Sequence, residues 1–528
     1  MLKLDFNERA DSLPTWLRDF KLDTTQLWKY PNRQEIEVLI AEKFNTSANN
    51  VFLSNGGDES IELLFKLCKL NNKSILLPLP AFSQYTHQLS IWGLDFITVD
   101  AQPDLSIDVK ALSQQLKANQ WLIVTRPNNP TGECISEAVV LDLIHQAKQC
   151  GTFVFLDEAY VEFFQQDDAQ NYGLEFDHVI SLRTFSKAFG LAGARLGYLL
   201  GNETLIAQFK KYAMPFNVNS LSLQTAKKAL QNTEEMRVYC SNIAKNRQHI
   251  FDYLCSCGIE VFNGQGNFLL FKLNSQRQQI LSSFLAKKDI QIKTQVNDLP
   301  DCLRLTVPED ITELMQVFQT VFQPNLIAFD MDGVLIDTSG SYDRCILETA
   351  HSFSNNQFTN NMISALRAQG GFNNDWDLTQ GLLAQAGTVV EIKKIIKTFQ
   401  QFYQVYKSEE INLLDNDDLF QGHYSTAIVT GRPKTEALDG VAQLNIKPDH
   451  IISADDVQHH KPSPEGLNNL KATTKKNRLW FCGDTVDDMQ AGQAAEALCI
   501  GIGKDAENLY QAGADIVLEN INQLEALL

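Results

Sequence analysis

The chain has 528 residues, more than one hydrophobic core usually organises, so two or three domains are expected. Its hydrophobic fraction of 44% and charged fraction of 21% are typical of a soluble globular protein and argue against long disordered stretches. The formal net charge of −19 disfavours general binding to nucleic acid, and no uninterrupted apolar run reaches the roughly 18 residues that a membrane helix needs.

The cysteines and the N-terminal segment indicate the compartment. The ten cysteines are scattered, and no group of cysteines and histidines has the spacing of a zinc site. Residues 1–14 contain no apolar run that could serve as a signal peptide. We therefore expect a soluble, cytoplasmic protein with reduced thiols and no membrane partner.

Short apolar runs rich in β-formers alternate with amphipathic runs through most of the sequence. Helical stretches such as residues 136–151 separate these runs. This alternation predicts an α/β fold with a largely parallel sheet, in which functional residues follow the carboxyl ends of strands. The expected strands lie at residues 74–80, 120–127, 152–159 and 178–186.

A second strand-and-loop beginning appears at residues 325–337, directly after a helical stretch and a short breaker. We place the main boundary there, which predicts one domain at residues 1–323 and another at 324–528. Residues 341–420 have a helical pattern without strand runs. They are expected to form an insertion before the next strand at residues 424–432.

A lysine, Lys187, follows the strand expected at residues 178–186. Enzymes that use pyridoxal 5′-phosphate (PLP) need a lysine to hold the cofactor as a Schiff base and to move protons. They also need a site for the cofactor's phosphate, which Thr184, Ser186 and Arg195 could supply with hydroxyls and a guanidinium. Taken alone, the pattern is weak and favours an ordinary solvated lysine on a helix, so the interpretation depends on the other segments.

Three further segments supply the remaining groups in the right order. Asp157 ends a strand and could keep a pyridine nitrogen protonated. Tyr160 and Asn129 could reach the phenolic oxygen of the same ring. Gly57 and Asp58 lie at a helix start, whose free backbone N–H groups can bind phosphate. Read separately, these segments are a tight turn and a helix cap.

Together these segments resemble the aspartate-aminotransferase fold family, and most closely its histidinol-phosphate aminotransferase branch, over about residues 5–322. RTFSKAFGLAGARLGY (183–198) and RPNNPTGE (126–133) carry the resemblance. It implies that Phe82 stacks on the cofactor ring and that Tyr30 reaches the cofactor of a neighbouring subunit, so a homodimer is expected. It also assigns the Schiff-base lysine, the pyridine partner, the phenolate partners and the phosphate ligands, which are Lys187, Asp157, Asn129, Tyr160, Thr184, Ser186, Arg195, Gly57 and Asp58.

The substrate end departs from the family pattern. Arg304 fits the family arginine that grips the acidic group of the substrate. A second family arginine is replaced by Lys293, which is a point charge rather than a bidentate fork. The resemblance therefore implies a complete cofactor site and leaves the identity of the substrate open.

Residues 327–337 form an apolar strand that ends in the pattern Asp-x-Asp-Gly. Two aspartates separated by one residue on an extended backbone point the same way. This suits Asp330 as a nucleophile and Asp332 as an acid and base toward a leaving alcohol. A calcium loop would need further regularly spaced ligands and a terminal glutamate, which the following residues lack.

Three later strand ends complete this second set. Thr430 could bind a phosphoryl oxygen, and Lys461 could offset phosphate charge. Mg²⁺ prefers carboxylate and phosphate oxygens and stabilises phosphoryl transfer. The expected ligands are Asp330, the Asp332 carbonyl, Asp484 and Asp488.

This second set resembles the haloacid-dehalogenase (HAD) superfamily across residues 325–528. The resemblance implies a Rossmann-like domain with a helical cap at about residues 341–420, and Asp332 favours a phosphatase over a dehalogenase. Within the cap, residues 370–379 (GGFNNDWDLT) are unusually polar and aromatic. They are expected either to line the substrate pocket or to form a helix-capping loop.

The leading functional hypothesis is a bifunctional enzyme that transfers an amino group and then removes a phosphate. Histidinol phosphate, formed from imidazole acetol phosphate with a donor such as glutamate, is the most economical substrate. The alternatives are another phosphorylated keto or amino metabolite, or a decarboxylase of a phosphorylated amino acid. A PLP-sensing regulator would need a nucleic-acid-binding module, which the acidic chain does not show.

Overall fold

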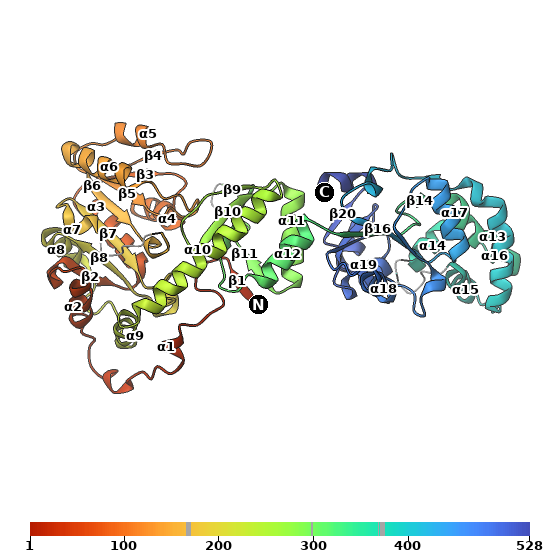
Figure 1. Cartoon of the computed structure of the whole chain (residues 1–528), viewed down its shortest axis with the longest axis horizontal. Helices are drawn as coiled ribbons and strands as arrows, with labels where there is room; N and C mark the ends of the chain where they lie inside the picture. Colours follow the sequence, from red (N-terminus) through yellow and green to blue (C-terminus); the bar gives the residue numbers. More distant parts are fainter. Residues whose placement is uncertain (165–170, 297–298, 368, 370–374) are drawn as a thin grey trace. The chain divides into compact units, whose positions relative to one another are not determined.

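The computed structural model describes residues 1–164, 171–296, 299–367, 369 and 375–528, and it contains two compact units (Figure 1). The first unit comprises residues 1–274 and 289–312, and the second comprises residues 275–288 and 313–528. None of the helices in the described residues is long and apolar enough to cross a membrane.

A seven-stranded sheet forms the centre of the first unit. All its strand pairs are parallel except those of β8, which runs antiparallel to both its neighbours. Each of the four strands expected from the sequence in this half is present, somewhat shorter than expected. In sheet order the strands are β2 (Val51–Ser54), β8 (Gly197–Gly201), β7 (Val179–Thr184), β6 (Phe153–Asp157), β5 (Gln120–Thr125), β3 (Ser74–Pro78) and β4 (Phe96–Val99).

Helices cover both faces of this sheet, and each face has its own apolar core. On α6 (Glu137–Cys150), Val140, Leu143, Ile144 and Ala147 recur every three or four residues and are buried. The helix ends where Gly151 adopts a left-handed conformation with φ 72°. The other helices over these faces are α3 (Gly56–Leu70), α4 (Ser83–Trp92), α8 (Glu203–Tyr212), α5 (Val109–Gln114) and α7 (Tyr172–Glu175).

A smaller antiparallel sheet completes the first unit, with order β12–β10–β9. The N-terminal strand β1 (Leu2–Leu4) pairs in parallel with β11 (Ile290–Ile292), so the N-terminal segment lies next to the strand region that precedes Arg304. The remaining elements are α1 (Thr15–Arg18), α2 (Gln34–Lys43), α9 (Ser220–Leu230), α10 (Thr233–Ser256), β9 (Glu260–Phe262), β10 (Phe268–Lys272) and β12 (Cys302–Thr306).

A six-stranded parallel sheet forms the centre of the second unit, and β13 occupies a middle position in it. Because β13 is flanked by β16 and β18, the residues after these three strands meet at one edge. In sheet order the strands are β17 (His450–Ile452), β16 (Ser425–Val429), β13 (Leu326–Phe329), β18 (Leu479–Gly483), β19 (Leu498–Ile502) and β20 (Ile516–Leu518). Its helices are α17 (Lys434–Leu444), α18 (Glu465–Thr474), α19 (Val486–Ala494) and α20 (Ala506–Gln511).

The helical insertion packs around a separate apolar core and forms a cap at one end of the second unit (Figure 1). The sequence predicted no strand in residues 341–420, and this was wrong at β15 (Ile411–Asn412), which pairs with β14 (Ile336–Asp337). A two-residue strand is too short to leave a period-two pattern. The cap helices are α13 (Arg344–Phe353), α14 (Asn360–Arg367), α15 (Asp375–Gln385) and α16 (Ile392–Tyr406).

Two helices that precede β13 in the chain, α11 (Ser275–Lys287) and α12 (Thr312–Phe322), belong to the second unit apart from Thr312. In α11, the hydroxyl of Ser283 donates to Asp515 Oδ1 at 2.7 Å, and Lys287 Nζ lies 2.7 Å from Asp515 Oδ2. In α12, the carbonyl of Thr320 accepts a bond from Trp480 Nε1 at 2.6 Å. The domain boundary expected between residues 323 and 324 differs from this division at these helices, and it stays a prediction.

Candidate active sites

A cavity of about 640 Å³ in the first unit is lined by the ends of β5, β6 and β7 and by the first turn of α3. It gathers every residue predicted for the cofactor and substrate of this half except Tyr30. These residues are Gly57, Asp58, Phe82, Asn129, Asp157, Tyr160, Thr184, Ser186, Lys187, Arg195, Lys293 and Arg304.

Lys187 enters this cavity from the turn that follows β7. Its Nζ donates to the backbone carbonyl of Phe6 at 2.9 Å and lies 5.5 Å from the centre of the Tyr160 ring. The side chain is half-buried, and no ion pair involves it among the described residues. The Lys187 amine therefore lies among the other cavity groups, and no carboxylate of the described residues pairs with it.

Asp157 ends β6 and is buried. Its Oδ2 accepts a hydrogen bond from the hydroxyl of Tyr85 at 2.6 Å, and its Oδ1 accepts one from the backbone N–H of Ala159 at 3.0 Å. Burial raises the pKa of Asp157 to about 6, although these two hydrogen bonds oppose the shift. A cation facing this carboxylate would favour its ionised form, which suits a protonated ring nitrogen.

Tyr160 and Asn129 lie together in the cavity wall. The hydroxyl of Tyr160 accepts hydrogen bonds from Asn7 Nδ2 at 3.1 Å and from Asn129 Nδ2 at 3.5 Å. Asn129 Oδ1 in turn accepts a bond from Arg304 Nη1 at 2.6 Å. The two predicted phenolate partners and the predicted substrate arginine thus form one connected network.

The groups predicted for a phosphate lie at the junction of β7 and α3. Thr184 Oγ1 donates to Ser186 Oγ and accepts from the Ser186 backbone N–H, both at 3.0 Å. Arg195 Nη2 lies 2.6 Å from Asp58 Oδ2. The side chain of Asp58 would repel a phosphate, so its contribution to such a site is the backbone N–H at the helix start.

Arg304 and Lys293 are paired through their backbones by two hydrogen bonds of 2.9 and 3.0 Å. Arg304 Nη2 donates to the carbonyl of Asp5 at 2.9 Å, and its buried Nε has no hydrogen-bond partner among the described residues. Burial lowers the pKa of this guanidinium. A buried cation with an unused donor fits an anionic group of a substrate.

Tyr30 is not part of this cavity. Its side chain is 80% exposed and stacks on Phe216 with ring centres 4.3 Å apart. Nothing in a single chain tests whether it reaches a second subunit, so this role stays a prediction.

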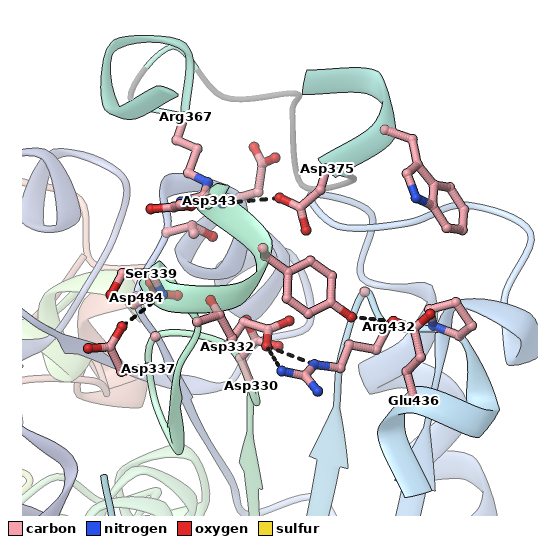
Figure 2. A pocket seen from close by; sticks show the side chains of 18 residues that line it. Asp330, Asp332, Asp337, Ser339, Asp343, Arg367, Asp375, Arg432, Glu436 and Asp484 are labelled. Carbon is pink, nitrogen blue, oxygen red and sulfur yellow. Dashed lines mark hydrogen bonds and ion pairs between the residues drawn. The ribbon is translucent and has the colours of Figure 1, made fainter. Parts of the chain in front are cut away.

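A cavity of about 190 Å³ in the second unit lies at the carboxyl edge of its sheet, below the cap (Figure 2). Asp330 follows β13 and is buried. Its carboxylate lies with those of Asp484 and Asp488, and one oxygen of each falls within 4.8 Å of the others. Lys461 Nζ lies 2.9 Å from Asp330 Oδ1 and 2.5 Å from Asp488 Oδ1.

This cluster of three carboxylates carries more negative charge than the single amine of Lys461 balances. Burial raises the pKa of Asp330 to about 7 and raises that of Asp484 as well. The buried Oδ1 of Asp484 has no hydrogen-bond partner among the residues that the structure describes. Three carboxylates facing one lysine, with an unused oxygen, form a donor set that fits a hard divalent cation such as Mg²⁺.

The glycine of the Asp-x-Asp-Gly motif allows the loop after β13 to approach β18. Gly333 has φ 72°, and a Cβ at this position would overlap Asp484 Oδ2. Any other residue would push the loop away from the carboxylate cluster. The glycine therefore positions both strand ends at the site.

Asp332 lies apart from the carboxylate cluster and pairs with Arg432. Arg432 Nε donates to Asp332 Oδ1 at 2.8 Å, and its Nη2 lies 2.7 Å from the same oxygen (Figure 2). Behind this pair, Nη2 of Arg432 lies 3.2 Å from Glu410 Oε1, and both of these side chains are 1% exposed. The predicted acid and base is therefore held by a buried guanidinium.

Thr430 and Lys461 lie near Asp330, the predicted nucleophile, as expected from the order of the strands. Thr430 directly follows β16 and is buried, and its hydroxyl accepts a bond from the Arg432 backbone N–H at 3.1 Å. Both residues line a small adjoining cavity. Their roles as a phosphoryl-oxygen ligand and as a balancing cation stay predictions.

Part of the polar cap segment also reaches the second-unit cavity. Residues 370–374 lie outside the described residues. Asp375 and Trp376, at the start of α15, line the cavity. The pocket-lining alternative therefore holds for the described end of this segment.

Residues 1–318 match the family model for aminotransferases of class I and II. The chain belongs to the class I and II aminotransferase family. The rest of the chain adds a second family, because residues 327–502 match the model for haloacid dehalogenase-like hydrolases. The protein is thus an enzyme with an aminotransferase part and a HAD-like hydrolase part, and the fold class predicted from the sequence is confirmed.

Named relatives of this aminotransferase include the histidinol-phosphate aminotransferase of Polaromonas naphthalenivorans (strain CJ2). It is 31% identical over 319 residues, which cover 58% of this chain and 86% of the relative. The solved histidinol-phosphate aminotransferase from Clostridium acetobutylicum has a TM-score of 0.55 at 22% identity and covers 60% of this chain and 97% of its own. The enzyme from Sinorhizobium meliloti, solved in complex with pyridoxal-5′-phosphate, has a TM-score of 0.52 at 22% identity, with coverages of 58% and 86%.

The sequence interpretation missed several residues that contact and position the predicted residues of the two sites. Tyr85 follows Phe82 by one helical turn, and that spacing was the available signal. Arg432 stands two residues after Thr430 in the same motif, TGR, and was not assigned. Glu410 lies outside the motif that contains Thr430 and Arg432, so no local pattern in the sequence points to its contact with Arg432.

Proposed function

We propose that this chain is a bifunctional enzyme that transfers an amino group with PLP and hydrolyses a phosphate monoester with Mg²⁺. The observation that carries the first activity is the position of Lys187 in a cavity whose other walls supply a buried carboxylate, a phenol–amide pair and a phosphate-sized set of donors. The observation that carries the second is Asp330 beside Lys461, Asp484 and Asp488. The two activities correspond to domains that we place at residues 1–323 and 324–528.

In the first site, each described residue has a distinct task. Lys187 holds the cofactor and moves a proton, and Asp157 keeps the ring nitrogen protonated. Bound PLP supplies the electron sink that this chemistry requires. Thr184, Ser186 and Arg195 bind its phosphate. Phe82, which lines the same cavity, would stack on the cofactor ring.

The substrate of the first site carries an acidic group that Arg304 and Lys293 bind. The Arg304 guanidinium is already fixed by Asn129 and the Asp5 carbonyl, so it loses little freedom on binding. Because Asn129 also contacts Tyr160, substrate binding is coupled to the position of the phenol. Tyr160, Asn129 and Asn7 then orient the oxygen of the cofactor ring.

In the second site, Asp330 attacks phosphorus, and the bond to the leaving oxygen breaks. Asp332 gives its proton to that oxygen, and later takes one from the water that hydrolyses the aspartyl-phosphate. Thr430 and Lys461 bind the phosphoryl oxygens. Asp330, Asp484, Asp488 and the Asp332 carbonyl hold Mg²⁺, which neutralises phosphoryl charge when it is bound.

We propose that imidazole acetol phosphate is aminated to histidinol phosphate, with glutamate as the donor, and that histidinol phosphate is then hydrolysed. The names of the related enzymes support this substrate. Lys293 in place of an arginine supports the alternative of another phosphorylated keto metabolite, because a lysine binds an acidic group less directionally. A decarboxylase of a phosphorylated amino acid is the remaining alternative.

We further propose a cytoplasmic homodimer formed through the aminotransferase part. Tyr30 and its neighbour Trp28 are 80% and 78% exposed, which is unusual for large aromatic side chains in a single chain. A second copy that covers them would bring Tyr30 to the other cofactor site. Sedimentation of the wild type and of Tyr30→Ala measures this association directly.

The proposed function is tested by following both half-reactions in the purified full chain. Phosphate release is measured from a panel of amino-phosphates and keto-phosphates, with and without glutamate. We expect phosphate release from the keto-phosphate to depend on glutamate and on PLP, whereas release from the amino-phosphate needs only Mg²⁺. Release from the keto-phosphate at the same rate without glutamate would show that amination is not part of the sequence.

The pairing of Arg432 with Asp332 predicts how the second activity depends on the leaving group. Arg432→Lys replaces a fork that binds one carboxylate through two nitrogens with a single point charge. Asp332 should then be poorly oriented, and kcat for an alkyl phosphate should fall by about 100-fold, within the range that general acid catalysis contributes. p-Nitrophenyl phosphate, whose leaving group needs no proton, should lose much less.

These two substrates distinguish positioning from a structural role. A variant that is merely less well folded loses activity on both substrates equally. Equal losses would therefore contradict the assignment of Arg432 as the residue that positions Asp332. The melting temperature of the variant, measured alongside, reports the contribution of Arg432 to folding.

A further inference from the structure

The cavity below the cap has a wall that neither the nucleophile nor the proposed metal uses. Above and beside Asp332, the cap and the start of α17 close a space of small-molecule size (Figure 2). The leaving group of a phosphate ester bound at Asp330 would occupy this space. Its wall contains Tyr342 and Trp376, Pro433 and Glu436, and Asp375.

The two guanidinium groups of this wall are already neutralised. Arg367 Nη1 lies 2.7 Å from Asp343 Oδ1, and its Nη2 lies 3.0 Å from Asp375 Oδ1. Arg432 is shared in the same way between Asp332 and Glu410. Each arginine thus faces two carboxylates, so neither offers net positive charge to an anionic leaving group.

Glu436 differs from the carboxylates that pair with these two arginines, because its hydrogen-bond partners are neutral. It is 8% exposed, and its two oxygens accept hydrogen bonds from the hydroxyl of Tyr342 and, at 2.8 Å, from Gln400 Nε2. No cation pairs with Glu436 among the described residues. Neutral donors orient a carboxylate but leave its charge uncompensated, and a nearby cation would lower its free energy.

The net charge of the whole wall is negative, like the charge of Glu436. Apart from Asp330, Asp484 and Asp487 near the proposed metal, the cavity is lined by two cationic side chains and five anionic ones. The cationic side chains are Arg367 and Arg432, and the anionic ones are Asp332, Asp337, Asp343, Asp375 and Glu436.

Aromatic rings strengthen the preference for a cation. Tyr342 and Trp376 both line the cavity, and the face of an aromatic ring attracts an organic cation. Arg432 lies 4.9 Å from the centre of the Tyr342 ring, so this ring already contacts one cation of the protein. A compact space with excess carboxylates and ring surfaces suits an ammonium group rather than a carboxylate or a neutral polyol.

We propose that the hydrolase site selects phosphate monoesters whose leaving alcohol carries a positively charged amine, with Glu436 and Asp375 as the residues that recognise it. This inference rests on the proposed phosphatase function. It sets the order of the two reactions, because only the aminated product of the first site carries the ammonium group. The unaminated keto-phosphate, and any ester whose leaving group carries a carboxylate, are poor substrates.

The test measures kcat/KM of the full chain with Mg²⁺ for three esters of similar size: 2-aminoethyl phosphate, ethyl phosphate and phosphoglycolate. p-Nitrophenyl phosphate serves as a general reporter of phosphatase turnover. We expect the ammonium ester to exceed the neutral ester by at least about 10-fold, since a polar site discriminates against an analogue that leaves its groups unpaired. The carboxylate ester should be the poorest of the three.

Two matched variants locate the preference. Glu436→Gln removes one negative charge from the cavity wall, and Asp439→Asn removes one from the same helix, at an exposed position that pairs with Lys407 outside the cavity. The ratio of kcat/KM for the ammonium ester to that for the neutral ester should fall about 10-fold in Glu436→Gln and stay unchanged in Asp439→Asn. Because this ratio is taken within one protein, partial unfolding of a variant does not change it.

The outcomes separate this inference from the function on which it rests. Turnover of p-nitrophenyl phosphate without a preference for the ammonium ester would overturn the inference and leave the phosphatase in place. An equal fall of the ratio in both variants would also overturn it, because a general negative field would then explain the preference. Absence of turnover on every ester would overturn the phosphatase itself.

Discussion

Lys187→Ala is expected to abolish amino transfer, with a loss of at least about 10⁴-fold in kcat/KM, because in the proposed function this lysine both holds the cofactor and moves the proton. General acid–base catalysis alone contributes about 10² to 10⁴-fold. Removal of the covalent link to the cofactor adds to this loss. The measurements are the rate of keto-acid formation from the amino donor and the absorbance spectrum of protein-bound PLP.

The structure indicates why this variant should remain folded. The Lys187 amine donates a hydrogen bond to the carbonyl of Phe6, and it lies at the edge of a large cavity rather than in the apolar core. Lys211→Ala, at an exposed position in the last turn of α8, is the matched control and should keep full activity. Amino transfer by Lys187→Ala at the wild-type rate would remove Lys187 from the chemistry.

The same variant should keep its phosphatase activity. The residues assigned to phosphate hydrolysis all lie in the second unit, whereas Lys187 belongs to the first. A preserved rate with p-nitrophenyl phosphate would also show that the protein is folded. This makes the second activity an internal control for the first.

The strands and the motifs at their ends were predictable because both signals are local. The apolar runs that became β5, β6 and β7 are buried on both faces, so each reads as a continuous hydrophobic segment. In parallel sheets, the residues after such strands meet at one edge, which is why the sequence alone places Asp157 and Lys187 together. The same reasoning united Asp330, Thr430 and Asp484.

The groups that hold those residues in place were not predictable in the same way. Asn7 and Tyr160 are 153 positions apart and meet because the N-terminal segment is held by the pairing of β1 with β11 and by hydrogen bonds between Asn7 and Thr306. Glu410 reaches Arg432 because the cap chain returns through β15. Such contacts depend on how distant segments close on one another, and no periodicity or spacing in the sequence encodes them.

The substrate end shows a further limit. Arg304 and Lys293 could be assigned from their motif, but the neutralisation of Arg367 and Arg432 by carboxylates could not. Two unpaired arginines beside the proposed phosphatase site would attract an anionic ligand. The pairings with carboxylates remove that attraction and leave Glu436 and Asp337 in the wall without an ion pair among the described residues.

Asp330→Asn is expected to abolish phosphate hydrolysis while amino transfer continues. An amide cannot attack phosphorus, and loss of the nucleophile in a serine hydrolase costs roughly 10⁶-fold in kcat. Removal of Mg²⁺ by a chelator should have the same effect on this activity and none on the first. The measurement is phosphate release and keto-acid formation in the same preparation, with Asp439→Asn as the control for loss of a carboxylate from the second unit.

The substitution also tests the electrostatic account of the carboxylate cluster. Asp330, Asp484 and Asp488 share one lysine, and burial opposes the ionisation of Asp330. Without Mg²⁺, replacement of one of these carboxylates by an amide relieves repulsion, so the melting temperature of Asp330→Asn in a chelator should equal or exceed that of the wild type. With Mg²⁺, the wild type gains stability by binding the ion, and the variant, which lacks one ligand, should gain less.

A variant that lost amino transfer as well, although its melting temperature was normal, would contradict two independent sites. A variant stabilised by Mg²⁺ as much as the wild type would instead show that Asp330 does not hold the ion, and the metal would then belong to Asp484 and Asp488 without the nucleophile.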